Sequence, residues 1–293
     1  MPILILLCAV GGLFGLPNPW LHVPPAALLF PFSLTWIAWR AIHPKQAFLL
    51  GWLGGTFALC SIFYWTAVPC YRYGGLPLWL SLLAPLGISV LLSLYFAQYS
   101  LLMHHAARKL SAFPLILCAG VLWFVAEHLN SFVLSGFPWN ALSSGFAVWP
   151  STMQGASLIG GYGMSGLLAA LAVSLLMLNT ARSAWVTAVL ILAFLGGYGP
   201  YRMNHFEVDG PELNLALIQG NIDQAVKWDL AFHDKTIKRY ADLTDSALMR
   251  DKVDLAVWPE TALPFYFQEN SPSTAKVYEY LHTTNITLLV GAP

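Results

Sequence analysis

The sequence has little charge for its length. Only 10% of its 293 residues are Asp, Glu, Lys or Arg, whereas a soluble domain carries about 25%. Fourteen acidic residues balance fourteen basic ones, so no basic excess indicates nucleic-acid binding. A chain with so little charge cannot cover a water-facing surface throughout, which excludes a wholly soluble fold.

Acidic residues are nearly absent from the first two thirds of the chain. Glu127 is the single Asp or Glu before residue 206, and all the others lie between Glu207 and Glu279. Basic residues are divided evenly about the same point. We therefore expect two regions in different solvents, residues 1–205 in lipid and residues 206–293 in water.

Cysteine is also scarce, and none follows residue 118. The sequence has neither a CxxC pair nor a Cys/His spacing typical of metal sites, so we predict no disulfide framework, no metal and no cofactor. Free cysteine usually behaves as a small buried hydrophobe. The four are Cys8, Cys60, Cys70 and Cys118.

Long apolar stretches dominate the first region. A spanning helix needs roughly 20 mostly apolar residues, and the stretch at the N-terminus lacks the basic cluster of a signal peptide. Lys and Arg favour cytoplasmic loops, which predicts a cytoplasmic N-terminus and an extracytoplasmic polar region. The expected spans, about seven, are residues 2–16, 24–42, 46–68, 76–103, 112–128, 162–179 and 184–200.

A long connection, residues 127–161, lies on the outer side in this topology. It is aromatic, rich in glycine and nearly uncharged. Structureless loops of this length are usually functional or disordered, and this one is too apolar for disorder. It forms either a wall for a lipid substrate or a packing segment. Glu127 at its start is a functional candidate as an intramembrane acid, although an acid near a helix end can simply reach water.

The polar region has the pattern of an α/β sheet. Apolar strands are predicted at residues 213–219, 253–258 and 286–290, and amphipathic helices at 229–248 and 273–284. Asp229 is placed to cap the first of these helices. Three strands make a thin domain with an open edge, so we expect it to be truncated or completed by another chain.

The run DLAVWPETALPF, residues 254–265, places a carboxylate after an apolar strand. Pro259 fixes its own φ and biases Trp258 toward an extended backbone. Glu260 therefore projects from a fixed point at the carboxyl end of a strand, where α/β sheets tend to build sites. It is either a catalytic base or an acid in the first turn of a short helix.

Three stretches resemble the apolipoprotein N-acyltransferases, membrane members of the nitrilase superfamily. They are LALIQGNIDQAVKWD at 215–229, DLAVWPETALPF at 254–265 and, more weakly, SGFPWNALS at 135–143. The resemblance implies a polytopic α-helical membrane domain, residues 1–205, followed by the start of a nitrilase-like αββα sandwich, residues 206–293.

The same resemblance implies a chemistry. Glu260 matches the general base of a Glu-Lys-Cys triad, in which the cysteine takes an acyl chain from a phospholipid resembling phosphatidylethanolamine. The amine of a diacylglyceryl-cysteine on an apolipoprotein then accepts it. Trp228 matches a tryptophan near the family's active site, and Gln219, Gly220 and Asn221 match a loop that need hold only turn residues. The setting is the bacterial inner membrane, with a periplasmic polar domain and a monomeric complete protein.

The sequence departs from this family in one respect. The family's lysine and cysteine, and its final membrane helix, fall beyond Pro293, so we expect a chain truncated at its C-terminus and inactive alone. Lys227 does not match that lysine, and Lys276 lies on a predicted solvated helix. Cys70 is a poor substitute, since a nucleophile must lie within hydrogen-bond range of its base.

Two other functions remain open at this stage. One is a membrane-anchored nitrilase-type amidase acting on a small amide. The other is a non-enzymatic lipid-binding or assembly fragment that pairs its open sheet edge with a partner. Lipid access predicts that Phe137, Pro138 and Trp139 lie beside the catalytic mouth, whereas an amidase would close that side.

Overall fold

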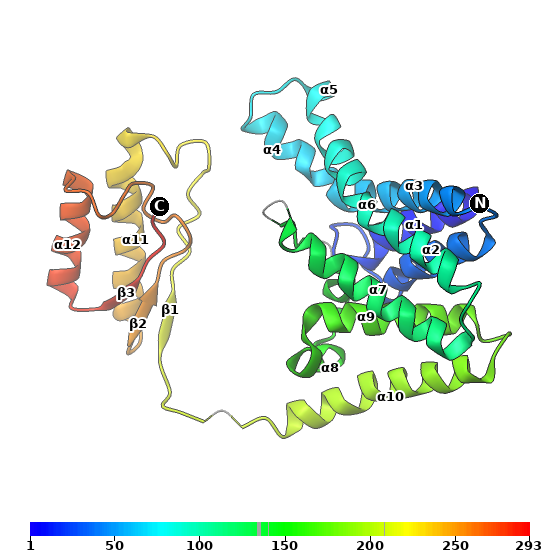
Figure 1. The fold of residues 1–293 in the computed structure, drawn as a ribbon. Helices are drawn as coiled ribbons and strands as arrows, with labels where there is room; N and C mark the ends of the chain where they lie inside the picture. Colours follow the sequence, from blue (N-terminus) through cyan, green and yellow to red (C-terminus); the bar gives the residue numbers. More distant parts are fainter. Residues whose placement is uncertain (134–135, 140, 208) are drawn as a thin grey trace. The chain divides into compact units, whose positions relative to one another are not determined.

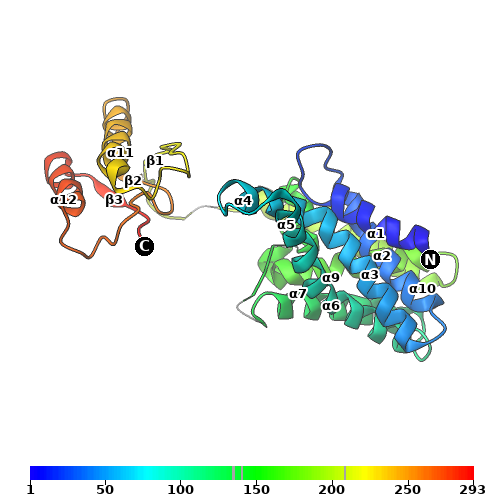
Figure 2. The ribbon, with the colours of Figure 1, turned by 90° about the horizontal axis from the view of Figure 1, so that it is seen from above.

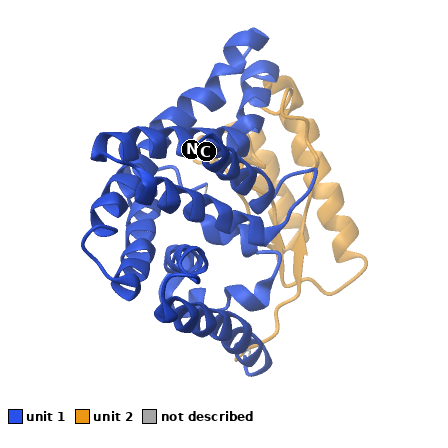
Figure 3. Cartoon of the chain, turned by 90° about the vertical axis from the view of Figure 1, so that its right-hand side faces the viewer, with its two compact units in different colours: residues 1–206 blue, residues 207–293 orange. Residues whose placement is uncertain are grey.

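The computed structural model describes residues 1–133, 136–139, 141–207 and 209–293. The chain divides into two compact units, Met1–Phe206 and Glu207–Pro293 (Figure 3). We call them the membrane domain and the polar unit. The expected fold class is confirmed, because a helical membrane domain precedes a small α/β unit.

Within the described residues, five helical segments of the membrane domain are long and apolar enough to cross a bilayer, which makes this a multi-pass membrane protein. The first two are interrupted, one by a 3₁₀ turn and the other at a single residue. The five segments are Pro44–Arg72 (α3 Pro44–Phe63, η2 Tyr64–Thr66, α4 Ala67–Arg72), Leu78–Ala106 (α5 Leu78–Ser81, α6 Leu83–Ala106), α7 Ala112–Asn130, α9 Ala156–Leu176 and α10 Arg182–Asn204.

The two N-terminal helices are shorter than expected for spans. Helix α1 covers Pro2–Gly15, and the 3₁₀ turn η1 Pro24–Leu28 leads into α2 Leu29–Arg40. Prolines at positions 17, 19, 24 and 25 separate them, and proline interrupts helical hydrogen bonding. The total of about seven spans therefore stays a prediction.

The membrane domain is held together by an aromatic centre and by close backbone contacts. Trp123 of α7 is buried, and its ring lies 5.2 Å from the rings of Phe30, Phe96 and Tyr99. A Cβ at Gly120 would stand 2.8 Å from the carbonyl oxygen of Gly166. The backbones of α7 and α9 thus touch through glycine, as packed membrane helices commonly do.

The polar unit is a parallel sheet with its helices on one face (Figures 1 and 2). Strands β1 Leu215–Leu217, β2 Leu255–Val257 and β3 Thr287–Leu289 pair in that order. The crossovers are α11 His233–Leu248, preceded by the turn η5 Leu230–Phe232, and α12 Pro272–Thr284. The Asp229 side chain accepts a hydrogen bond from the amide of Ala231. Asp229 therefore caps η5 and not α11, which begins after Phe232 without a side-chain cap.

The two faces of the sheet differ in burial. Ala216 and Ala256 point into the core under the helices, with Ile237, Tyr240 and Val277. On the other face, the side chains of Leu217 and Leu289 are 75% and 60% exposed. Parallel sheets are usually covered on both faces, so this apolar face is an unusual surface for water.

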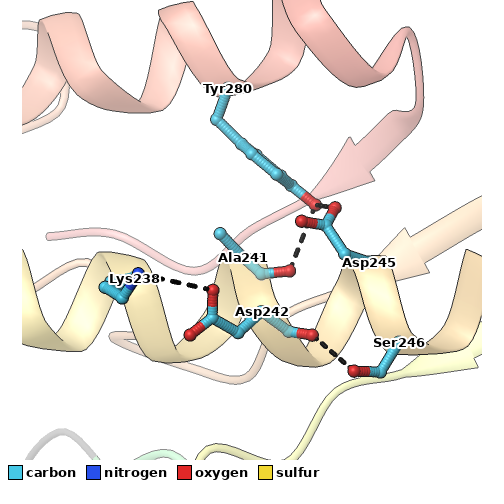
Figure 4. Close-up of polar contacts among 6 residues, drawn as sticks. All are labelled: Lys238, Ala241, Asp242, Asp245, Ser246 and Tyr280. Carbon is cyan, nitrogen blue, oxygen red and sulfur yellow. Dashed lines mark hydrogen bonds and ion pairs between the residues drawn. The ribbon is translucent and has the colours of Figure 1, made fainter.

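Polar side-chain contacts join α11 to α12 (Figure 4). The Tyr280 hydroxyl donates to Asp245 Oδ1 at 2.9 Å and lies 3.4 Å from the carbonyl oxygen of Ala241. Burial of the ring and the acceptor carboxylate together raise the pKa of Tyr280. Lys276 of α12 forms an ion pair with Asp234 of α11, so its side chain ties the two helices together.

Asp254 links the starts of β1 and β2. Its Oδ2 accepts hydrogen bonds from both the backbone amide and the side-chain amide of Asn214, each at 2.9 Å. These donors favour the ionised form and hold the pKa of Asp254 below its usual 3.8. The ionised Asp254 carboxylate therefore stabilises the fold at a pH above the pKa that this carboxyl has in the unfolded chain. This stabilisation is lost as pH falls through the lower pKa of the folded state.

We expect the Asp254→Asn variant to lose less stability in acid than the native chain. The native β1–β2 pairing should weaken as pH falls below about 4, whereas the variant has no charge to lose. Amide hydrogen exchange in β1 and β2, corrected for the intrinsic rate at each pH, measures this difference. Asp251→Asn, an exposed neighbour, is the control. Equal acid sensitivity in all three proteins would contradict the assignment.

Candidate functional site

The strand that precedes Glu260 is anchored by a buried tryptophan. Trp258 is 2% exposed, its Nε1 donates to Thr244 Oγ1 at 2.9 Å, and its ring stacks on Tyr240 with centroids 5.2 Å apart. Its amide also donates to the carbonyl oxygen of Leu289 in β3. The chain therefore leaves β2 from a fixed point, and Pro259 restricts its direction further.

Glu260 itself lies in a tight turn. The amide of Ala262 donates to the carbonyl oxygen of Pro259 at 3.1 Å, and Thr261 has a left-handed φ of 51°. Residues 260–263 form a turn and a bend rather than a helix. The interpretation of Glu260 as a first-turn helix acid is therefore wrong. The side chain is exposed, where it can meet a reactant.

The exit of β3 passes directly against this turn. Leu263 donates its amide to the carbonyl oxygen of Gly291 at 3.2 Å. A Cβ at Gly291 would stand 2.7 Å from the Cα of Glu260, which no side chain tolerates. Glycine is required here because two backbones come into contact.

The exit of β1 completes the same edge of the sheet. The amide of Ile218 donates to the carbonyl oxygen of Val257 at 2.9 Å, and a Cβ at Gly220 would lie 2.6 Å from the Tyr240 ring. Gln219 donates to the Asn221 side chain at 2.8 Å, and Asn221 has a φ of 51°. These residues form a constrained turn. The carboxyl ends of parallel strands are where α/β folds build sites.

Lys227 is a contact of this site that sequence reasoning missed. Its Nζ donates to Thr261 Oγ1 at 2.5 Å and lies 3.4 Å from the carbonyl oxygen of Glu260. The ammonium thus tethers the segment that follows β1 to the turn that carries Glu260. Its neighbour Trp228 is 54% exposed, so an indole ring is available to a ligand beside the tether.

The other candidate residues belong to other elements of the chain. Lys276 is engaged with Asp234 on the helical layer, and Cys70 lies half-buried in α4 of the membrane domain. A cleft of about 580 Å³ separates residues 220–226 from α11, but neither Glu260 nor Trp228 lines it.

In the membrane domain, the expected loop 127–161 is partly helical. Helix α7 runs to Asn130 and α9 begins at Ala156, with a kink at Gly160 whose φ is 72°. Between them lie η4 Leu142–Phe146 and α8 Pro150–Met153. Ser135 and Asn140 of the SGFPWNALS motif lie outside the described residues.

The aromatic part of this loop rests on the end of the third predicted span. Phe137 meets Phe63 edge-on at 5.3 Å, and Trp139 stacks on Trp65 at 5.2 Å with an interplanar angle of 14°. The Phe137 amide donates to the Asn130 carbonyl oxygen, and the Asn130 side chain donates to that of Phe137. Trp139 remains 60% exposed, so the loop presents a supported aromatic surface.

Glu127 fastens the next part of the loop to the bundle. Its side chain is buried, and Oε1 accepts hydrogen bonds from Trp123 Nε1 and from the Leu142 amide, both at 2.8 Å. The following amide, that of Ser143, donates to Ser165 Oγ of α9. Glu127 thus holds η4 against α7, which gives this intramembrane acid a structural role.

We expect Glu127→Ala to destabilise the membrane domain by about 1–3 kcal/mol for each donor left without an acceptor. Glu127→Gln keeps an acceptor oxygen and should cost less. Thermal unfolding in detergent measures both variants. Equal melting temperatures for the two would contradict the role, and loss of activity in Glu127→Gln at an unchanged melting temperature would indicate a part in chemistry.

Comparison with known proteins finds one family along most of the chain. Residues 10–174 match the family model for the apolipoprotein N-acyltransferase N-terminal domain. An apolipoprotein N-acyltransferase of Geobacter metallireducens is 31% identical, over 91% of this chain and 55% of that protein. Those of Allorhizobium ampelinum and Pseudomonas aeruginosa are 32% and 30% identical, over 88% and 99% of this chain and 52% and 57% of theirs.

The chain therefore spans about half the length of the curated relatives it matches. The family model covers more than half of the chain, and each of these relatives aligns with parts of both the membrane domain and the polar unit. This chain belongs to the apolipoprotein N-acyltransferase family.

Proposed function

We propose that these residues supply the membrane part and the general base of an enzyme that N-acylates lipoproteins. The enzyme moves an acyl chain from a phospholipid, of the phosphatidylethanolamine type, to the amine of a diacylglyceryl-cysteine. The observation that carries the proposal is the placement of Glu260, an exposed carboxylate held at the carboxyl end of the central strand by Trp258 and Lys227.

In this mechanism Glu260 accepts the proton of a cysteine thiol that lies outside residues 1–293. The thiolate attacks the ester carbonyl of the phospholipid, and a lysine, also outside these residues, stabilises the oxyanion. The intermediate collapses to a thioester, and the lysophospholipid alkoxide leaves with the proton. The lipoprotein amine then attacks the thioester, an amide forms, and the thiol is restored.

Two features of the chain support this assignment beyond Glu260. Trp228 is exposed beside the tethered turn, where its ring is suited to contact a bound lipid. The uncovered face of the sheet, with Leu217 and Leu289, is suited to pack against a second layer of a nitrilase-like sandwich. We place the polar unit in the periplasm of a bacterial inner membrane, with the N-terminus in the cytoplasm and a monomeric protein.

The test uses the gene product that contains residues 1–293, reconstituted in phosphatidylethanolamine vesicles with one labelled acyl chain. We expect the label to appear on a synthetic diacylglyceryl-cysteine peptide in a linkage that resists hydroxylamine. Without the peptide, label should accumulate on the enzyme in a linkage that hydroxylamine cleaves, because two substrates visit one site in turn.

Absence of label from both peptide and enzyme would overturn the proposal. Hydrolysis of small amides by the same preparation, with no lipid label transferred, would instead favour the amidase. The two outcomes are separable because ammonia release and lipid labelling are measured in parallel.

A further inference from the structure

An apolar cavity in the membrane domain has no part in the proposed reaction. It has a volume of about 310 Å³ and lies among α9, α10, η1 and the loop segment of η4 and α8. Figure 1 shows α8 beside α9 and next to the C-terminal half of α10. Every residue that lines it belongs to the membrane domain.

The walls of this cavity offer almost no polar group. Phe146, Met164, Leu168 and Leu195 are buried residues of its lining, and no charged side chain is among the described residues that line it. Thr152 carries a hydroxyl, but its Oγ1 donates to the carbonyl oxygen of Trp149 at 2.8 Å. Apolar cavities stay dry and bind apolar ligands, and the volume lies at the lower end of the range for ligand pockets.

The cavity borders an exposed apolar surface of α10. Val189 and Leu190 are 58% and 63% exposed on this predicted span, which is where an apolar surface meets acyl chains. Leu192, 53% exposed, belongs both to this surface and to the cavity lining. In a bilayer, the apolar molecule that reaches such an opening is a lipid.

We propose that this cavity is a binding site for one acyl chain of a bilayer lipid. The chain enters past Leu192 and packs against Met164 and Leu168 of α9, with Phe146 of the loop covering it. A lipid held there would join the loop segment to α9 and α10. The proposal does not depend on the proposed acyl transfer, since none of these residues takes part in that reaction.

Gly196 lines the cavity and has room for a side chain. A Cβ at Gly196 would meet no atom within 4 Å, and this residue lines the cavity. Gly197 has equally open surroundings but is not among the lining residues. Both positions have room for a larger residue, and glycine in a helix interior is intrinsically unfavourable, so neither substitution should destabilise α10. Only a side chain introduced at position 196 would fill the cavity.

The experiment uses photo-crosslinking in the complete gene product. The protein is reconstituted in vesicles of phosphatidylethanolamine and phosphatidylglycerol that contain a phosphatidylethanolamine with a diazirine at the end of one acyl chain. After illumination, adducts are mapped by peptide mass spectrometry. We expect adducts on Met153, Met164 and Leu168, beyond the density seen on the exposed face at Val189 and Leu190.

Gly196→Leu should abolish the cavity adducts and leave those at Val189 and Leu190, whereas Gly197→Leu should leave both sets. Melting temperatures confirm folding, and Gly196→Met, with a more flexible side chain, replaces Gly196→Leu if the latter unfolds. Cavity adducts that persist in the filled variant, or that never exceed those on the exposed face, would overturn the proposal.

Discussion

Replacing Glu260 by glutamine should lower acyl transfer by about 10²- to 10⁴-fold, the usual contribution of a general base. The turn keeps its backbone hydrogen bonds, because the Pro259–Ala262 bond and the Lys227 contacts involve no atom of the Glu260 side chain. The amide cannot accept the thiol proton at neutral pH. The variant should therefore fold normally and fail in the first chemical step, formation of the thioester.

The measurement is the rate at which labelled acyl chains appear on enzyme and peptide, in the gene product that contains residues 1–293. Glu269→Gln is the matched control, since it makes the same substitution at an exposed position of the same unit and should leave the rate unchanged. Full transfer by Glu260→Gln would remove the general base from the mechanism. Equal losses in both variants would indicate an effect on net charge.

The secondary structure of the polar unit could be predicted because its apolar periodicity is local. Alternation around residues 213–219 and 253–258 marks β1 and β2, and the apolar face of residues 229–248 marks α11. The strands are shorter than these runs, with three paired residues each. Pairing ends where the chain turns into its loops, and the alternation of side chains does not mark that point.

The geometry of the candidate site could be predicted only in part, because half of it depends on contacts between loops. Trp258-Pro259-Glu260 is a continuous signal, and its rigid exit follows from proline and from a buried aromatic residue. The tether from Lys227 to Thr261 joins residues 34 positions apart, and no periodicity relates them. It could have been inferred only by noting that β1 and β2 are neighbours with a shared carboxyl edge.

In the membrane domain, the apolar runs predicted where the long helices lie better than whether each helix is uninterrupted. The run 46–68 predicts one uninterrupted span, yet α3 ends at Phe63 and a 3₁₀ turn precedes α4. Hydropathy measures solvent preference and is insensitive to a local change of helical hydrogen bonding. The hydrogen bonds that Glu127 accepts could not be predicted either, since the donors are Trp123 on the same helix and a backbone amide in the loop.

Trp258→Ala should destabilise the polar unit by about 3–5 kcal/mol, the cost of removing a buried tryptophan. The substitution empties the space between Tyr240 and the sheet and leaves Thr244 Oγ1 without its donor. Domains are stable by about 5–15 kcal/mol, so most of the margin is lost. Amide hydrogen exchange in β2 and α11 should accelerate, and acyl transfer should fall because Glu260 is no longer held in place.

Trp228→Ala is the matched comparison, because it removes the same side chain from a position that is 54% exposed. Exposed substitutions usually change stability by less than about 0.5 kcal/mol, so exchange in β2 and α11 should stay as in the native protein while acyl transfer falls. Comparing the two variants then distinguishes the structural role of Trp258 from the substrate contact of Trp228. If Trp228→Ala transfers normally, the indole has no role in binding. If Trp258→Ala leaves exchange unchanged, the rigid exit from β2 has another cause, and the position of Glu260 needs a different explanation.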